Sequence, residues 1–295
     1  MTTAPPCAAP DFAPRAPRVQ PPLLACDCHA HILGPAATYR YSDHRVYTPP
    51  DCLLTDYQAM LKVLGISRSV LVQPSVYGQD NRVMLKALEE MKGAWRGVAV
   101  VKSTVSDKEL TEMHDAGVRG IRVNIVDIQN KQPRLPIAEL RPLAQRIRAL
   151  GWHIEFLLHV SDFPNLDQDL ADFPVDTVFG HLGYSSTALG IDDPGFQALL
   201  RMLKTERAWV KLTGPYRIST RAMPYPDVSP FAQALLETSP NQLLWGSDWP
   251  HVMVKGTMPN DGDLLDLLPV WIPDPVMQQK ILVRNPERLY GFQRG

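Results

Sequence analysis

The chain has 295 residues, 45% of them hydrophobic, and its 30 Lys and Arg against 31 Asp and Glu give a formal net charge of -1. This balance provides no net positive electrostatic field that would attract nucleic acid or an anionic membrane, so we expect neither as a partner. No apolar run approaches the roughly 20 residues of a transmembrane helix, and the N-terminus lacks a basic region followed by an apolar core. We therefore expect a cytoplasmic protein that recognises its partner locally.

The N-terminal region differs in composition from the rest of the chain. Residues 1–22 are crowded with proline and alanine and show no apolar periodicity. We predict an extended arm over 1–22 and a single domain over 23–295. The arm could reach a neighbouring subunit, so a homo-oligomer is an open alternative. The spacing of the four cysteines does not suggest a disulfide framework, and we expect reduced thiols packed in the core.

From residue 23 onward, short apolar runs alternate with segments of helical spacing, which is typical of a parallel sheet with crossover helices. Helices are expected between the runs, for example over 80–91 and over 137–150, the latter ending at Gly151. The runs predicted to form strands are 23–31, 68–75, 97–102, 120–124, 152–158, 177–181, 209–213 and 243–248. This pattern predicts an α/β fold, a (β/α)8 TIM barrel, whose typical length is roughly 250 residues. An open doubly wound sheet is the alternative, although no glycine-rich phosphate fingerprint follows any predicted strand.

The first predicted strand ends in the polar stretch "CDCHAH". Because alternate residues of a strand share a face, Asp27, His29 and His31 are expected on one face. Cys26 and Cys28 are expected on the opposite, outer face, away from the histidines, so we do not expect their thiolates to bind a metal. A His-x-His pair by itself is more often a hydrogen-bonded core pair than a functional site.

Polar side chains also end three other predicted strands. His181 ends the sixth, and Asp248 ends the eighth with His251 just beyond it. Arg122 on the fourth alternates with apolar residues that belong against the helices, so it is expected to point into the barrel. Each residue alone has a structural explanation, such as a helix cap at Asp248. Four strands that bring titratable groups to one barrel mouth nevertheless indicate a functional site, because catalytic groups come from the C-terminal ends of barrel strands.

Other titratable residues are predicted to point into the barrel. On the fifth strand, Glu155 and His159 share a face, and the sequence leaves open whether they reach the site. His153, early on the same strand, is expected to pack in the core. Lys211 on the seventh strand is expected to be a structural ion-pair partner rather than a nucleophile.

The ordered set of motifs resembles a known family. The stretches that carry the resemblance are "DCHAH", "YTPPD", "VLVQPSVYGQDN", "GVRGIRVN", "GHLG", "WVKLTGPYR", "WGSDWPH" and "LVRNPERLY". Together they resemble the amidohydrolase superfamily, and within it the branch of 2-pyrone-4,6-dicarboxylate lactonase, from about Cys26 to Tyr290. The resemblance implies a distorted (β/α)8 barrel and a carboxylic ester hydrolase that opens a lactone in the degradation of aromatic compounds or sugar acids.

The resemblance also implies catalytic roles. Asp248 would be the general base that activates water, and His29, His31 and His181 would polarise the lactone carbonyl directly or through a divalent ion. The same four residues suit zinc or manganese as ligands. The superfamily is mostly metal-dependent, whereas the pyrone lactonase is known as a metal-independent member. No lysine ends the fourth strand, so we expect either no metal or one, and not a binuclear centre.

Substrate-binding roles follow from the same resemblance. Arg122 and Arg217 would hold a substrate carboxylate, with Tyr47 and Ser75 as nearer hydrogen-bond partners. His251 would orient Asp248 or the substrate.

The sequence departs from the pyrone lactonase pattern at two positions. Ile128 stands where that enzyme has a second arginine, and Leu157 stands where it has a tyrosine. Both changes remove hydrogen-bonding groups that could bind a dicarboxylate, because bidentate arginine is the usual partner of a carboxylate. The expected partner is therefore a related anionic lactone, such as a substituted muconolactone or a sulfomuconolactone.

Two other functions are weighed against lactone hydrolysis. Decarboxylases of the superfamily use a similar His-x-His pair, a sixth-strand histidine and a late aspartate on one zinc, acting on aromatic or muconate-type acids. That function needs a fifth-strand histidine as a further ligand, and His159 is the candidate. A catalytically silent barrel that only binds small acids is disfavoured, because all four core polar residues are present.

Overall fold

The computed structural model describes residues 4–127 and 134–293. Its centre is an eight-stranded sheet in which the strands are paired in chain order, each parallel to the next. The strands are β1 (Cys26–Ala30), β2 (Arg68–Val72), β3 (Trp95–Ala99), β4 (Val118–Asn124), β5 (His153–Leu157), β6 (Thr177–Phe179), β7 (Ala208–Leu212) and β8 (Leu243–Trp245). All eight predicted strands are confirmed, with shorter bounds in most cases.

The sheet closes between β1 and the segment that follows β8. His29 O accepts a hydrogen bond from Asp248 N at 2.8 Å, and His31 N donates one to Trp249 O at 2.8 Å. The (β/α)8 barrel is therefore confirmed, and the open doubly wound alternative is wrong. Closure also places the functional stretches of β1 and β8 side by side.

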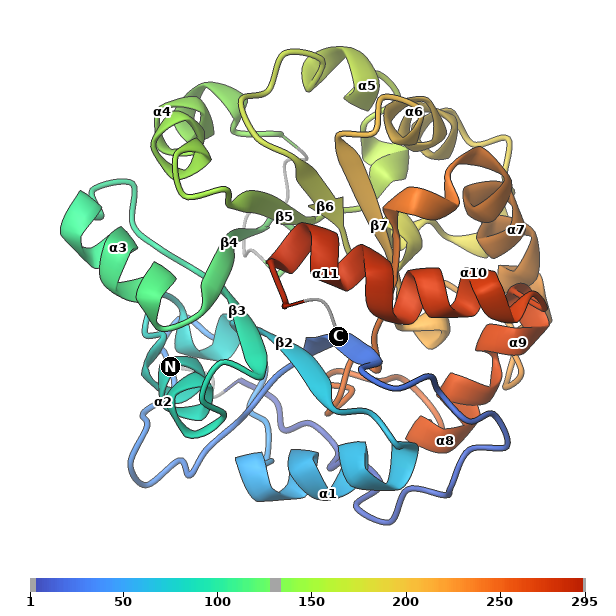
Figure 1. Ribbon diagram of the computed structural model, residues 1–295, viewed down its shortest axis with the longest axis horizontal. Helices are drawn as coiled ribbons and strands as arrows, with labels where there is room; N and C mark the ends of the chain where they lie inside the picture. Colours follow the sequence, from blue (N-terminus) through green and yellow to red (C-terminus); the bar gives the residue numbers. More distant parts are fainter. Residues whose placement is uncertain (1–3, 128–133, 294–295) are drawn as a thin grey trace.

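Helices surround the barrel (Figure 1). They are α1 (Leu54–Leu64), α2 (Arg82–Glu90), α3 (Asp107–Asp115), α4 (Ile137–Arg148), α5 (Leu166–Asp169), α6 (Pro194–Leu203), α7 (Ser229–Thr238), α8 (Asp261–Asp266), α9 (Leu268–Trp271), α10 (Pro275–Gln279) and α11 (Asn285–Tyr290). The two helices predicted over 80–91 and 137–150 correspond to α2 and α4, and Gly151 lies just past α4 with a φ of 68°. Several crossovers are short or broken into pieces, so the barrel is distorted.

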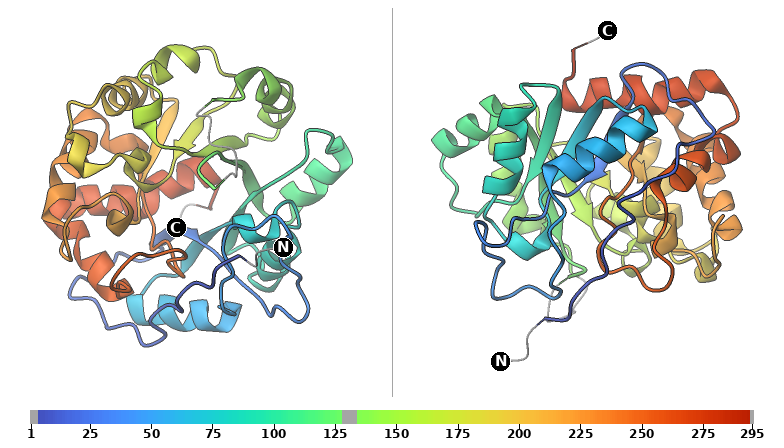
Figure 2. Two further views of the ribbon diagram at one scale, coloured as in Figure 1. Left: turned by 180° about the vertical axis from the view of Figure 1, so that it is seen from behind. Right: turned by 90° about the horizontal axis from the view of Figure 1, so that it is seen from below.

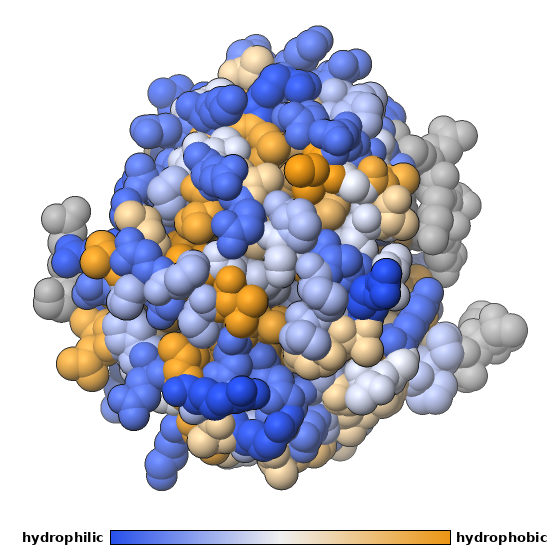
Figure 3. All heavy atoms as spheres, turned by 90° about the vertical axis from the view of Figure 1, so that its right-hand side faces the viewer, coloured by the Kyte–Doolittle hydropathy of each residue, from blue (hydrophilic) through white to orange (hydrophobic). Residues whose placement is uncertain are grey.

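The outer surface over α7, α9 and α10 is mixed in character. Figure 3 shows hydrophobic side chains on this face in small groups among hydrophilic ones. The exposed Val270 and Val276 belong to this region. Within the described residues, no helix combines the length and the apolar character needed to cross a membrane.

The side chains of β1 point in directions that differ from the prediction. Cys26 and Cys28 lie inside the barrel, in a buried cluster with apolar residues of β2, β3, β6 and β8. Asp27 points outward, where its Oδ2 accepts a hydrogen bond of 2.9 Å from the Tyr57 hydroxyl of α1. The pairing of β1 with β2 shifts register within β1, so that His29 joins the cysteines on the inner face. Strict alternation was the wrong assumption, because a bulge inserts an extra residue and re-aims the side chains after it.

The described part of the N-terminal arm is bonded to loops at the edge of the barrel. Cys7 N donates to Thr48 O at 2.9 Å, and Arg15 N donates to Asn260 Oδ1 at 3.0 Å. Further along, Arg18 N donates to Asp266 Oδ1 at 2.7 Å. Figure 2 shows the two ends of the described chain at opposite ends of the barrel.

Candidate active site

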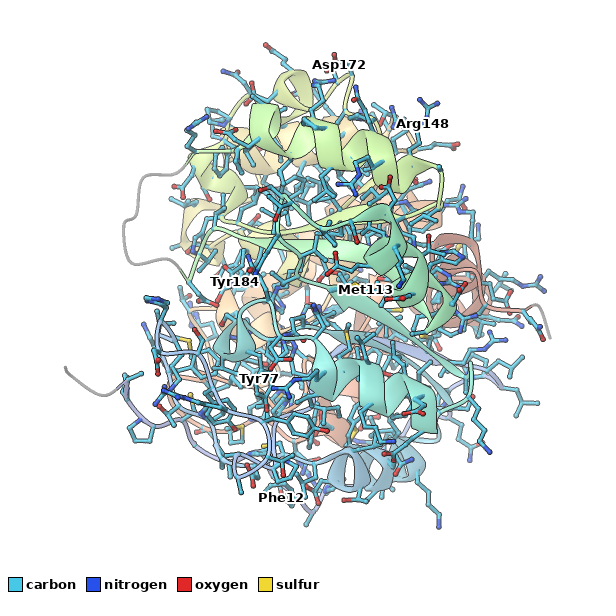
Figure 4. All side chains as sticks on the ribbon, turned by 90° about the vertical axis from the view of Figure 1, so that its left-hand side faces the viewer. Phe12, Tyr77, Met113, Arg148, Asp172 and Tyr184 are labelled. Carbon is cyan, nitrogen blue, oxygen red and sulfur yellow. The ribbon has the colours of Figure 1, made fainter. Side chains whose placement is uncertain are left out.

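A cavity of about 460 Å³ opens at the C-terminal ends of the strands. In Figure 4, Tyr77 and Tyr184, from loops after β2 and β6, are labelled on this side of the molecule. The predicted site residues that line the cavity are His31, Tyr47, Ser75, Arg122, His181, Arg217 and Asp248. His29 and His251 lie behind the wall, 1% and 0% exposed. The structure thus brings together all the residues that the motifs singled out.

The two histidines of the first motif are neutral and share one orientation. His31 Nδ1 lies 2.6 Å from Val72 O, and because a carbonyl oxygen only accepts, Nδ1 carries the proton. His29 Nδ1 lies 3.2 Å from Glu155 Oε1 and 3.3 Å from Lys211 Nζ, so Nδ1 donates to the carboxylate in one tautomer and accepts from the ammonium in the other. Burial lowers the pKa of each imidazole to about 3. His31 therefore presents an unprotonated Nε2, and His29 does so in the tautomer that donates to Glu155.

Glu155 reaches the site indirectly, through His29. Lys211 Nζ donates to Glu155 Oε2 at 2.6 Å, and both side chains are almost completely buried. Lys211 is thus the structural ion-pair partner that the sequence predicts. The pair fixes the orientation of His29, since a carboxylate on one imidazole nitrogen sets the direction of the other.

Asp248 follows β8 in the left-handed backbone region, with a φ of 67°. Its Oδ2 accepts hydrogen bonds of 2.6 Å from Arg217 Nε and 2.6 Å from the Tyr216 hydroxyl. Burial alone would raise the pKa of this carboxyl, but the positive charge of Arg217 and the hydrogen bond from its Nε hold it well below its usual range. Asp248 is therefore ionised at neutral pH.

Three acceptor groups, which we call the acceptor cluster, converge in the site: His29, His31 and Asp248. One ligand atom from each lies within 4.8 Å of the others. His29 Nε2 and Asp248 Oδ1 have no hydrogen-bond partner among the described residues, although both are buried. Buried acceptors that face one another are unfavourable without a cation or proton between them. Imidazole and carboxylate donors of this kind fit a single zinc or manganese ion.

His181 lies at the edge of the acceptor cluster. Its Nδ1 is 2.9 Å from Thr213 Oγ1 and 3.8 Å from Asp248 Oδ2. Its ring packs edge-on against His29 with a centroid distance of 5.0 Å. The structure thus groups three of the four predicted metal ligands, with His181 adjacent to them.

His159 is turned away from the acceptor cluster. Its Nδ1 lies 3.2 Å from Tyr184 O, and its ring packs against the Tyr184 ring at 4.5 Å. It contributes to the cavity wall and is absent from the three-residue cluster found among the described residues. The fifth-strand ligand that a decarboxylase requires is therefore not placed here.

The two arginines differ in how much of their bonding capacity is used. Arg122, 7% exposed, donates from Nη1 to Gln73 O at 2.8 Å, while its Nε has no partner among the described residues. Arg217 donates from Nε to Asp248 and from Nη2 to Val252 O at 3.1 Å. Arg122 thus points an under-used guanidinium into the cavity, as predicted. Arg217 holds Asp248, a contact that the motif reading did not foresee.

Of the two departures from the pyrone lactonase pattern, one lies in the described part of the chain. Leu157 lines the cavity and gives it an apolar surface at the position where the pyrone lactonase pattern has a tyrosine. Ile128 lies outside the described residues. Nearby, Ser75 Oγ donates to Asp127 Oδ2 at 3.3 Å, which places an acidic group at the same rim.

Sequence reasoning missed two residues close to Asp248. Tyr216 bonds to Asp248, and Asp261 bonds to His251 at 3.1 Å. Tyr216 directly precedes Arg217 in "GPYR", so its position beside a motif residue was an available signal. No comparable signal marks Asp261, which starts a short helix.

Comparison with known proteins gives consistent matches. The family model described as Amidohydrolase matches residues 26–292. A 2-pyrone-4,6-dicarboxylate hydrolase from Comamonas testosteroni is 38% identical over 286 residues, which cover 94% of this chain and 93% of the relative. A 4-sulfomuconolactone hydrolase from Rhizobium radiobacter is 37% identical over 289 residues, 97% of this chain and 96% of the relative.

A solved structure agrees with these matches. The crystal structure of a candidate 2-pyrone-4,6-dicarboxylic acid hydrolase from Pseudomonas putida superposes with a TM-score of 0.82 at 33% identity, covering 93% of this chain and 100% of that chain. The matches extend over the whole barrel, and the barrel mouth holds the polar groups that hydrolysis requires. The chain is therefore an enzyme that belongs to the amidohydrolase family, in the branch that contains the 2-pyrone-4,6-dicarboxylate hydrolases.

Proposed function

We propose that the enzyme hydrolyses a carboxylate-bearing lactone of the pyrone, muconolactone or sulfomuconolactone type. The observation that carries this proposal is the acceptor cluster, which lies beside the guanidinium of Arg122 in one cavity. Ester-type hydrolysis needs a base for water and positive charge near the developing oxyanion. The relatives from Comamonas testosteroni and Rhizobium radiobacter, named as hydrolases of a pyrone dicarboxylate and of a sulfomuconolactone, support the same substrate class.

Asp248 is the proposed general base. Its Oδ2 is occupied by Arg217 and Tyr216, so the free Oδ1 is the oxygen that accepts the proton of the attacking water. When the ring C–O bond breaks, the same carboxyl returns the proton to the alkoxide leaving group. A carboxylate with so low a pKa is a weak base, so activation of the carbonyl or of the water must supply much of the rate.

The histidines of the acceptor cluster are suited to hold a cation rather than to donate a hydrogen bond to the carbonyl. The proton of His31 is on Nδ1, and with His29 in the tautomer that donates to Glu155 the Nε2 of each ring presents a lone pair. Held by His29 and His31 beside Asp248, a divalent ion such as zinc or manganese would polarise the lactone carbonyl and lower the pKa of water. His181 would complete the set from the edge. Between the two metal contents expected from the sequence, none or one, this arrangement favours one.

Arg122 is the proposed anchor for the substrate carboxylate. Its unpartnered Nε and small exposure leave it suited to a charge-assisted hydrogen bond. Tyr47 and Ser75 line the same part of the cavity and are the proposed hydrogen-bond partners beside it. Leu157 offers no hydrogen bond to a second carboxylate there, and the negative charge of Asp127 would repel one. The cavity therefore favours a muconolactone-type substrate over the pyrone dicarboxylate.

The decisive experiment is elemental analysis of the purified protein, combined with activity before and after chelation. We expect about one equivalent of zinc or manganese, hydrolysis of 4-sulfomuconolactone or a carboxylated muconolactone, and loss of activity on chelation that added metal restores. A neutral lactone of similar size serves as the control substrate and should be turned over poorly. Failure of the metal-replete enzyme to open any anionic lactone would refute the proposal.

A further inference from the structure

The two carboxylate oxygens of Asp248 have different surroundings. Oδ2 accepts hydrogen bonds from the Tyr216 hydroxyl and from Arg217 Nε, each at 2.6 Å. Oδ1 has no hydrogen-bond partner among the described residues and lies 3.7 Å from His29 Nε2. One oxygen is therefore fully engaged by the protein, while the other faces the acceptor cluster.

Tyr216 begins a chain of hydrogen bonds that leads away from the cavity. Its hydroxyl oxygen lies 3.0 Å from His251 Nδ1, and His251 Nε2 lies 3.1 Å from Asp261 Oδ1. His251 and Asp261 are both 0% exposed, so bulk water does not compete for these bonds. The chain joins three segments: the loop after β7, the turn after β8 and the start of α8.

The number of protons sets the direction of this chain. A tyrosine hydroxyl has one proton and an ionised carboxylate only accepts, so the Tyr216 proton goes to Asp248. His251 Nδ1 must then carry a proton and donate it to the Tyr216 oxygen. A second proton lies between His251 Nε2 and Asp261 Oδ1. The bonds from His251 Nδ1 and from the Tyr216 hydroxyl therefore donate toward Asp248, whereas an ionised Asp261 accepts from His251 Nε2.

We propose that Tyr216 is a positioning residue whose hydroxyl, oriented by His251 and Asp261, occupies Oδ2 of Asp248 and reserves Oδ1 for the reacting water. The proposal rests on the proposed hydrolase function, in which Asp248 accepts the water proton. Arg217 alone would not suffice, because a single Nε contact to the carboxylate leaves it free to rotate about that bond. Two donors on one oxygen, from different directions, hold the carboxylate plane.

The first test reads the proton on His251 directly and needs neither substrate nor metal. Nitrogen NMR of protein labelled with ¹⁵N-histidine, assigned by loss of a signal in His251→Gln, distinguishes protonated from unprotonated ring nitrogens. We expect a protonated Nδ1 in the wild type at neutral pH. An unprotonated Nδ1 would overturn the proposal, because the Tyr216 proton would then go to His251 and not to Asp248.

The second test is a double-mutant cycle in lactone hydrolysis. Tyr216→Phe is expected to lower kcat about 10- to 100-fold, the effect of losing one hydrogen bond to a charged group, with little change in KM. Asp261→Asn should lower kcat less. The double variant should be no slower than Tyr216→Phe alone, since Asp261 acts only through Tyr216.

Tyr290→Phe is the matched control for this cycle. Tyr290 is also a buried tyrosine, but its hydroxyl has no partner among the described residues and lies in the inner cluster of the barrel, and the variant should keep wild-type kcat. An unchanged kcat in Tyr216→Phe, a rise in KM alone, or losses that add in the double variant would overturn the proposal. If the wild type opens no lactone, the proposed function fails, and the NMR result still decides the direction of the chain.

Discussion

Both ends of the barrel hold buried charged side chains. At the N-terminal end their hydrogen-bonding groups are used within the protein, whereas at the C-terminal end several are left without a partner among the described residues. At the N-terminal end, Arg96 donates to Tyr290 O at 3.1 Å and to Gly291 O at 3.0 Å. Arg68 pairs with Glu287 at 2.9 Å, and the guanidinium groups of both arginines lie over the Phe292 ring. Figure 1 shows α11 lying across this end of the barrel. The C-terminal segment therefore closes it and uses the arginines' donors.

At the C-terminal end, several buried side-chain atoms have no hydrogen-bond partner in the part of the protein that the structure describes. Within the described chain, His29 Nε2 and Asp248 Oδ1 lack a partner to accept from, and Arg122 Nε lacks a partner to donate to. These atoms come together around one cavity. An unused atom alone is not the mark of a site, because both ring nitrogens of His153 also lack partners, as does the hydroxyl of Tyr290, whose ring lies 5.4 Å from the His153 ring. What distinguishes the active end is that a carboxylate and two imidazoles have ligand atoms within 4.8 Å of one another there.

The largest effect is expected from Asp248→Asn at the active end. The variant removes the base, so kcat for lactone hydrolysis should fall about 10²- to 10⁴-fold while substrate binding is largely retained. Steady-state kinetics together with binding of an unreactive analogue would measure this. Asp176→Asn, at the opposite end of the barrel, is the control and should keep wild-type kcat. Unchanged turnover in Asp248→Asn would remove this residue as the base.

Arg68→Met tests the closed end. The variant leaves Glu287 with an uncompensated buried charge, so the free energy of unfolding should fall by about 3–5 kcal/mol. Urea unfolding measures the loss, and kcat and KM of the folded protein should stay at wild-type values. The double variant Arg68→Met with Glu287→Gln should recover much of the stability. A fall in kcat with stability retained would contradict the division between the two ends.

Arg122→Met applies the same substitution to the active end. We expect KM for a carboxylated lactone to rise by an amount that corresponds to about 1.5–3 kcal/mol, the value of a hydrogen bond to a charged group. Stability should change less than in Arg68→Met, because fewer donors of Arg122 are used by the protein. A neutral lactone, which cannot pair with the guanidinium, serves as the control substrate. An unchanged KM would mean that the carboxylate binds elsewhere.

The smallest effect concerns Asp227, a structural carboxylate in a loop after β7. Burial alone would raise its pKa, but hydrogen bonds from Ser219, Thr187 and Thr220 lower it to about 2. A lowered pKa contributes stability that is present above the ordinary value of 3.8 and is lost as the pH falls toward 2. The difference in Tm between wild type and Asp227→Asn should therefore be constant near neutral pH and shrink in acid. A difference that does not depend on pH would show that the bonds, not the charge, stabilise this loop.

Much of the fold and the site could be predicted from local patterns. The eight strands are short apolar runs bounded by polar residues, and that pattern depends only on neighbouring positions in the chain. His29, His31, His181 and Asp248 were found because they lie toward the ends of predicted strands, and Arg122 because it alternates with apolar residues within one. Parallel strands of a closed barrel bring their carboxyl ends to one mouth. Periodicity and closure together were enough to gather these side chains.

The facing of β1 could not be predicted in this way. Its register shift depends on how β1 pairs with β2 and with the segment after β8, and no residue of "CDCHAH" indicates a shift. Alternation put Cys26 and Cys28 outside, whereas the structure puts them inside with His29. A bulge is a property of the pair of strands rather than of one strand.

The sequence by itself determined the barrel, the residues at its mouth and the family. Only the tertiary structure decided how those residues are bonded. Arg217 bonds to Asp248, where the resemblance implied a substrate carboxylate; Glu155 and Lys211 lie behind His29; and Tyr216, His251 and Asp261 form one chain. The reason is physical. Strand patterns arise from neighbouring residues, whereas the direction of a proton depends on donors and acceptors that meet only after distant segments have packed together.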